Sequence, residues 1–212
     1  SFSVRNLARF RCNLYMQRGS ISGAFRLVPR KILPLHELGL PPIVEELCEH
    51  PRGLVLVTGP TGSGKSTLLA AGNRMLLERA EGCGKMLTYE APIEFTYDTI
   101  KSPRSLVSQS EIPRHLADFA HGVRNALRRK PNIIMVGEAR DRETISAAIE
   151  AAQTGHAVYT TTHTTGVSST VRRMISSFEK EERGERAYAL METLRMIVTQ
   201  SLVPKVSGGR MG

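Results

Sequence analysis

The sequence has no tryptophan, only three cysteines, and aromatic residues make up just 5% of its 212 positions. No apolar run approaches the roughly 18 residues that a membrane-spanning helix needs. No continuous apolar segment follows the N-terminal arginines, as a secretory signal would require. Because the cysteines are odd in number and far apart, we expect neither a disulfide framework nor a cysteine metal site. A reducing, cytoplasmic location is the simplest interpretation.

Acidic residues are missing from the first 36 positions, although the whole chain is ordinary in its content of hydrophobic (41%) and charged (23%) residues. The net charge is +9, which is compatible with nucleic acid, acidic lipid or an acidic protein as partner. Alternation over 10–15 and 24–28 predicts short strands. We interpret residues 1–34 as the C-terminal part of a small N-terminal domain, and a solvated basic arm is the alternative.

A change of pattern follows the N-terminal segment. Prolines at 29, 34, 41 and 42 indicate a linker over residues 35–50 that includes a short helix at 43–49. Beyond it, apolar strands alternate with amphipathic helices, which predicts an α/β domain over residues 51–212 with a parallel sheet covered on both faces. The expected strands are 54–58, 85–89, 133–136 and 157–162, and the expected helices are 66–79, 114–129, 142–153, 167–177 and 185–202.

The most specific motif is a GxxxxGK[ST] sequence between an expected strand and an expected helix, which is the context that a phosphate-binding P-loop requires. It comprises Gly59, Pro60, Thr61, Gly62, Ser63, Gly64, Lys65, Ser66 and Thr67. Its glycines let backbone N–H groups turn toward an anion, and the helix N-terminus adds a positive dipole end. Lys65 is expected on the β- and γ-phosphates and Ser66 on Mg²⁺. The motif therefore predicts that the protein binds a nucleoside triphosphate with Mg²⁺. The sequence has no NKxD motif, so nothing in it suggests specificity for guanine.

Acidic residues follow two of the expected strands, at the sheet edge where α/β proteins bind ligands. Glu138 follows strand 133–136 after Gly137 and is our candidate for Mg²⁺ contact, with a helix-capping surface residue as the alternative. Glu94 is our first candidate, and Glu90 the second, for accepting a proton from attacking water. Ordinary loop charges are the alternative for both.

Basic residues complete the candidate site. His163 falls at the end of strand 157–162, where it could sense the γ-phosphate, although a structural role is equally compatible with its position. Arg124 and Arg128 lie four residues apart on one expected helix and so share a face. They could clamp a phosphate or a neighbouring subunit, but a solvated basic face is the favoured interpretation of the residues alone.

Four motifs in this order resemble the secretion and pilus-retraction ATPase superfamily: the P-loop, the acidic segment 89–95, Gly137 to Asp141, and the histidine segment 154–164. The similarity extends over about residues 9–204. Segments 89–94 and 108–115 are most similar to the type IVB branch of secretion and conjugation ATPases, the DotB/TraJ type. One departure is Ala91, where most pilus motors have Asp.

The resemblance implies a RecA-like P-loop NTPase core with a partial PAS-like N-terminal domain, assembled into a hexamer. It implies that Lys65 and Ser66 bind phosphate and Mg²⁺, that Glu94 activates water, that Glu138 serves the metal and that His163 senses the γ-phosphate. Arg11 and Arg26 match arginines that approach the nucleotide when the domains close. Arg124 and Arg128 match a second arginine pair near the active site.

The leading hypothesis is therefore a cytoplasmic ATPase motor of a type IVB secretion or conjugation system, held to inner-membrane machinery by partner proteins. A RecA-like nucleic-acid motor is the alternative that the net charge of +9 suggests. The scarcity of aromatic residues disfavours it, because single-strand binding commonly uses aromatic stacking platforms. A third hypothesis is a nucleotide-gated assembly platform that binds ATP but hardly turns it over.

Overall fold

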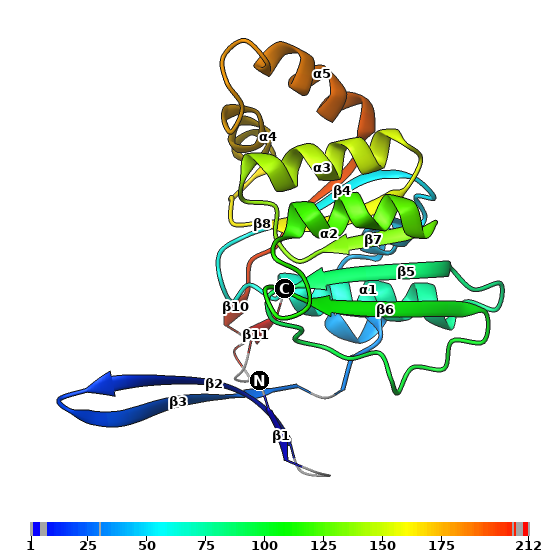
Figure 1. The fold of residues 1–212 in the computed structure, drawn as a ribbon. Helices are drawn as coiled ribbons and strands as arrows, with labels where there is room; N and C mark the ends of the chain where they lie inside the picture. Colours follow the sequence, from blue (N-terminus) through cyan, green and yellow to red (C-terminus); the bar gives the residue numbers. More distant parts are fainter. Residues whose placement is uncertain (1, 5–7, 30, 205, 207–209, 212) are drawn as a thin grey trace.

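A six-stranded parallel β-sheet forms the centre of the computed structural model, which describes residues 2–4, 8–29, 31–204, 206 and 210–211 (Figure 1). The strand order is β6-β5-β7-β8-β4-β9, and every neighbouring pair is parallel. Parallel pairing brings the carboxyl ends of all six strands to one edge. The strands are β4 (Gly53–Thr58), β5 (Gly84–Glu90), β6 (Ser105–Glu111), β7 (Ile133–Val136), β8 (Ala157–Thr162) and β9 (Leu194–Thr199).

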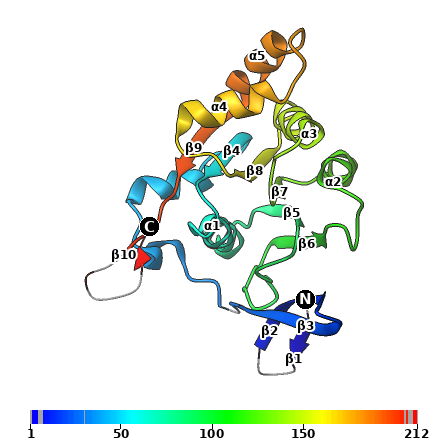
Figure 2. The ribbon, with the colours of Figure 1, turned by 90° about the vertical axis from the view of Figure 1, so that its left-hand side faces the viewer.

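Helices cover both faces of this sheet, because its central strands are apolar on both sides. Leu54 and Leu56 of β4 belong to one core cluster with α2, α3 and α5, whereas Val55 and Val57 belong to a second cluster with α1 (Figure 2). The helices are α1 (Lys65–Glu78), α2 (Phe119–Ala126), α3 (Arg142–Gln153), α4 (Val167–Ser176) and α5 (Arg183–Thr193), with 3₁₀ turns at Leu35–Leu38, Pro42–Cys48 and Leu127–Arg129. No helix in the described part of the chain is both long and apolar enough to cross a membrane.

A small antiparallel sheet at the N-terminus lies beside this core rather than within it (Figure 1). It consists of β1 (Phe2–Val4), β2 (Ala8–Gln17) and β3 (Ser20–Val28). The β2–β3 register places Arg11 directly opposite Arg26. The other face of this hairpin has exposed apolar side chains, among them Leu14, Met16 and Ile21. A short pair near the C-terminus, β10 (Val203–Pro204) and β11 (Arg210–Met211), completes the strands that are described.

The predicted α/β class and the parallel sheet are confirmed, but three secondary-structure expectations are wrong. The helix expected at 114–129 begins only at Phe119, because Asp118 caps it by accepting a hydrogen bond from the His121 N–H at 2.6 Å. The helix expected at 185–202 ends at Thr193, and the following residues form β9 beside β4. Strand β6 was not predicted, since it is a largely polar edge strand.

Candidate nucleotide-binding site

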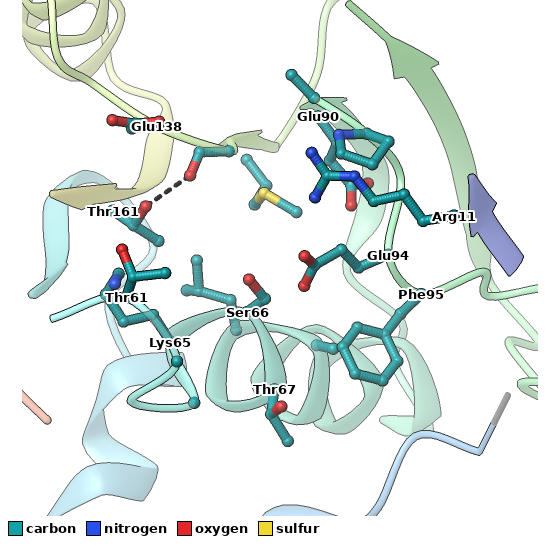
Figure 3. A pocket seen from close by; sticks show the side chains of 18 of the residues that line it. Arg11, Thr61, Lys65, Ser66, Thr67, Glu90, Glu94, Phe95, Glu138 and Thr161 are labelled. Atoms are coloured by element: carbon teal, nitrogen blue, oxygen red, sulfur yellow. Dashed lines mark hydrogen bonds between the residues drawn. The ribbon is translucent and has the colours of Figure 1, made fainter. Parts of the chain in front are cut away.

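The P-loop connects β4 to α1 at the carboxyl edge of the sheet and lines a cavity of about 480 Å³ (Figure 3). Gly64 immediately precedes α1 with a φ of 91°, in the left-handed region that glycine adopts without strain. No side chain caps the first turn of α1 and no acidic residue lies in it. The first N–H groups of a helix have no intrahelical acceptor, so this turn presents unpaired donors and a positive dipole end to an anion.

Lys65 lies at the base of the cavity with 7% of its surface exposed. Its ammonium group donates to the backbone oxygens of Gly59 at 2.8 Å and Pro60 at 3.0 Å. Burial lowers the pKa of Lys65, and the charges of Glu138 and Glu94 oppose that shift. The loop's own carbonyl oxygens thus hold the lysine, close to the place where phosphate oxygens would bind.

His163 joins Lys65 to Glu138 on one side of the cavity. Its Nδ1 lies 3.4 Å from the Lys65 ammonium nitrogen, and its Nε2 lies 3.5 Å from Oε1 of Glu138. An ammonium group can only donate, so this contact requires a lone pair on Nδ1 and places the proton of a neutral imidazole on Nε2, facing the carboxylate. Nearby, the Thr161 hydroxyl donates to the Gly137 oxygen at 2.6 Å, which ties β8 to the turn that precedes Glu138.

Glu90 and Glu94 lie on the opposite wall, on and after β5 (Figure 3). Glu90 is 8% exposed and accepts hydrogen bonds from the Thr88 hydroxyl at 2.7 Å and the Gln109 amide at 3.0 Å. Burial raises the pKa of Glu90, and these two hydrogen bonds oppose the rise. The Glu94 side chain is half-buried and points into the cavity toward Ser66. Glu94 is therefore the better placed of the two to meet a ligand.

Arg11 and Arg26 line the same cavity from the N-terminal hairpin. They are directly opposite across β2 and β3, a like-charge arrangement that destabilises a strand pair. Within the described part of the chain, neither guanidinium group has a hydrogen-bond or ion-pair partner. The cavity is thus basic on the hairpin side and at its base, with carboxylates between.

Arg124 and Arg128 do not join this group within one chain. Arg124 lines a separate cavity with Arg142 and Phe178, where α2 and α3 approach α5. Arg128 is exposed in the 3₁₀ turn that follows α2. The expectation that these arginines lie near the nucleotide is therefore not met by the single chain, and their contact with a neighbouring subunit stays a prediction.

The structure also brings in residues that the sequence did not single out. Met135, Phe95 and Leu202 line the cavity with apolar surface, and Gln109 reaches the acidic segment from β6. Gln109 lies in the segment 108–115, so the resemblance contained a signal for it. Leu202 had none, because residues 185–202 were expected to be helical throughout.

Fold and site together define a P-loop α/β protein whose phosphate-binding loop faces acidic side chains across one cavity. A protein-family model described as type II/IV secretion system protein matches residues 33–209. The chain is 43% identical over 212 residues to the type IV pilus retraction ATPase PilT of Pseudomonas aeruginosa, covering 99% of this chain and 60% of PilT. It belongs to the type II/IV secretion system protein family, and the predicted membership in the secretion and pilus ATPase superfamily is confirmed.

Solved structures agree with this assignment. The Legionella pneumophila ATPase DotB superposes with a TM-score of 0.92 at 49% identity, over 100% of this chain and 59% of DotB. The pilus retraction motor PilT with bound ADP superposes with a TM-score of 0.92 at 41% identity, over 99% of this chain and 60% of PilT. The chain thus spans about 60% of the length of these relatives.

Proposed function

We propose that this protein binds ATP with Mg²⁺ and hydrolyses it. One observation supports the proposal above all others: the P-loop and the carboxylates of Glu94 and Glu138 line the same cavity. A triphosphate bound to the loop would thus lie next to a candidate general base, Glu94, and a candidate Mg²⁺ ligand, Glu138. Relatives named as ATPases support the same reaction.

The residues that line the cavity are chemically suited to both the phosphates of ATP and Mg²⁺. The uncapped first turn of α1 and the Lys65 ammonium offer donors and positive charge to the β- and γ-phosphates. Magnesium is commonly held by one or two protein oxygens together with phosphate oxygens and water, and Ser66 and Glu138 would supply the protein oxygens here. When bound, Mg²⁺ would neutralise charge on the phosphates.

Glu94 would act as the general base. Its carboxylate faces the cavity and can accept a proton from a water molecule that attacks the γ-phosphate. Glu90 is less suited, because its carboxyl is buried and accepts the Thr88 and Gln109 hydrogen bonds. His163 would report the γ-phosphate, since it contacts Lys65 and Glu138 at once.

Arg11 and Arg26 would meet the phosphates from the hairpin side. Two guanidinium groups held opposite each other, without an acidic partner in the described chain, would be stabilised by an anion between them and the P-loop. Arginines brought to a transferring phosphoryl group can contribute about 10³ to 10⁵ in rate. The N-terminal sheet would thereby complete the site, and we propose that it is part of the PAS-like domain that the resemblance implies.

We further propose that the protein works as a hexameric cytoplasmic motor of a type IVB secretion or conjugation system, attached to inner-membrane machinery through partner proteins. The identity of 49% to the Legionella pneumophila DotB structure supports this branch, whereas identities of 43% and 41% to PilT, above the 39% to a second DotB structure, support pilus retraction as the alternative. Steep, salt-sensitive stimulation of hydrolysis by DNA would instead favour the nucleic-acid motor.

Two substitutions test the assignment of roles. We expect Lys65→Ala to abolish ATP binding, and we expect Glu94→Gln to retain binding but lose turnover. Binding is followed with a fluorescent ATP analogue and turnover by phosphate release from the complete protein. Matched controls are Lys101→Ala and Asp98→Asn, which remove the same charges from exposed positions near the acidic segment and should change neither quantity. Equal loss of binding in both test variants would contradict the roles given to Lys65 and Glu94.

A further inference from the structure

Gln109 on the edge strand β6 makes three hydrogen bonds to the acidic wall of the nucleotide cavity. Its Nε2 donates to Oε1 of Glu90 at 3.0 Å and to the backbone oxygen of Phe95 at 2.9 Å. Its Oε1 accepts from the backbone N–H of Tyr97 at 3.3 Å. One side chain thus contacts β5 and two points of the loop that follows it.

These partners fix the orientation of the amide. A glutamine amide has two N–H donors and one oxygen acceptor, and all three functions are used here. Reversing the amide would place its oxygen against a carboxylate and a carbonyl oxygen, and its N–H₂ against a backbone N–H. Only one of the two amide orientations forms all three hydrogen bonds, so the side chain is held in that orientation.

Side chains of β6 form hydrogen bonds with the loop backbone on both sides of Glu94. On one side of it, the Ile93 N–H donates to Oε2 of Glu111 at 3.2 Å. On the other side, Gln109 holds Phe95 and Tyr97. Among the described residues, Gln109 is the only one whose side chain forms a hydrogen bond with the backbone of residues 95–97, which follow Glu94.

Tyr97 carries the connection further. Its hydroxyl accepts a hydrogen bond from Nδ2 of Asn73 on α1 at 2.8 Å, and both side chains are buried. Helix α1 begins at the P-loop. The loop that presents Glu94 is therefore anchored to β6 through Gln109 and to the phosphate-binding helix through Tyr97.

We propose that Gln109 is a positioning residue for Glu94: it sets the path of the loop so that the Glu94 carboxylate faces the γ-phosphate position. The proposal rests on the role given to Glu94 under the proposed function. Gln109 does not line the cavity itself, so its effect must pass through the groups it holds, which are the loop backbone at Phe95 and Tyr97 and the Glu90 carboxyl. Displacing a reacting group by about 1 Å can cost about 100-fold in rate, and turnover should fall by that order when the amide is lost.

The test uses Gln109→Met, which keeps the length of the side chain but removes its donors and acceptor. We expect kcat to fall about 100-fold, whereas KM for ATP and affinity for a fluorescent ATP analogue stay unchanged. Melting temperature should fall modestly, because the Tyr97 N–H, the Phe95 oxygen and the Glu90 carboxyl each lose a hydrogen-bond partner. Leu106→Ala on the same strand is the control, because Leu106 is 69% exposed and outside the cavity. If Gln109→Met does not fold, Gln109→Asn retains the amide on a shorter side chain, and the same split between kcat and KM is expected.

A double variant separates positioning from general support of the fold. When Glu94→Gln has already removed the carboxylate, adding Gln109→Met should slow the residual hydrolysis no further. Unchanged kcat in Gln109→Met, or a loss of nucleotide affinity as large as the loss of turnover, would overturn the proposal. The single variant Glu94→Gln reports on the proposed function separately. If Glu94→Gln keeps full turnover, Glu94 is not the general base, and the positioning role of Gln109 is then also wrong. If Glu94→Gln is inactive but Gln109→Met remains active, only the positioning role of Gln109 is contradicted.

Discussion

Replacing Arg11 or Arg26 by Gln should lower turnover without lowering stability. The two arginines are directly opposite across β2 and β3, line the nucleotide cavity and lack an acidic partner in the described chain. Removing one positive charge therefore breaks no ion pair and relieves a like-charge contact. The expected change in unfolding free energy is small and favourable, at most about 1 kcal/mol, the upper end of cross-strand pair energies.

The expected effect on catalysis is much larger and of opposite sign. A guanidinium group that stabilises the transferring phosphoryl group is worth about 10³-fold or more in rate. Affinity for ATP should change little, because the P-loop and Lys65 hold the phosphates from the other side of the cavity. Stability and turnover would therefore move in opposite directions in the same variant.

Three measurements on the complete protein check this: phosphate release at saturating ATP, affinity for a fluorescent ATP analogue, and thermal melting without nucleotide. Arg18→Gln is the matched control, because Arg18 lies on the same hairpin, at the turn between β2 and β3, outside the cavity. Unchanged turnover in Arg11→Gln and Arg26→Gln would remove the hairpin from the mechanism. A turnover loss that follows a fall in melting temperature would also refute the reasoning.

Three further predictions concern the P-loop and the core. Ser66→Ala should raise the Mg²⁺ concentration needed for half-maximal hydrolysis, measured by magnesium titration at fixed ATP, since the hydroxyl is the proposed metal ligand. Gly59→Ala should reduce both nucleotide affinity and melting temperature, because an added Cβ would clash with the backbone oxygen of Gln200. Cys48 should resist alkylation in the native protein and react after unfolding in urea, as followed by mass spectrometry, because burial raises the pKa of its thiol to about 12.

The sequence predicts the parts of the fold whose local pattern and tertiary position agree. Strands β4, β7 and β8 are continuous apolar runs that are buried on both faces, and each was placed almost to the residue. The P-loop was equally predictable, since its glycines, lysine and flanking elements are all local. Glu94, Glu138 and His163 were expected to meet because carboxyl ends of parallel strands share one edge, and all three line the cavity.

The sequence fails where a distant partner decides the structure. In β9, residues 194–199 continue an amphipathic pattern, but parallel pairing with β4 makes them a strand. In β6, Leu106 and Val107 are the only apolar residues, so the sequence pattern does not indicate a strand. Backbone pairing with β5 makes this segment a strand. The resemblance pointed to the segment that contains Gln109, but its hydrogen bonds could not be predicted, because their partners are 12 to 19 residues away in sequence and meet it only in the folded sheet.

The placement of Arg11 and Arg26 bears on how a nucleotide could move one part of the protein against another. A ligand shifts an equilibrium between two arrangements only by the difference in its affinity for them. The P-loop belongs to the core and not to the hairpin, so its contacts with phosphate would contribute little to that difference. Under the proposed function, the arginine pair would supply it, since the two like charges are directly opposite across the strands and would be neutralised by phosphate bound between them and Lys65. Under the proposed function, loss of the γ-phosphate would weaken this contact first, and hydrolysis would thereby favour separation of the hairpin from the core.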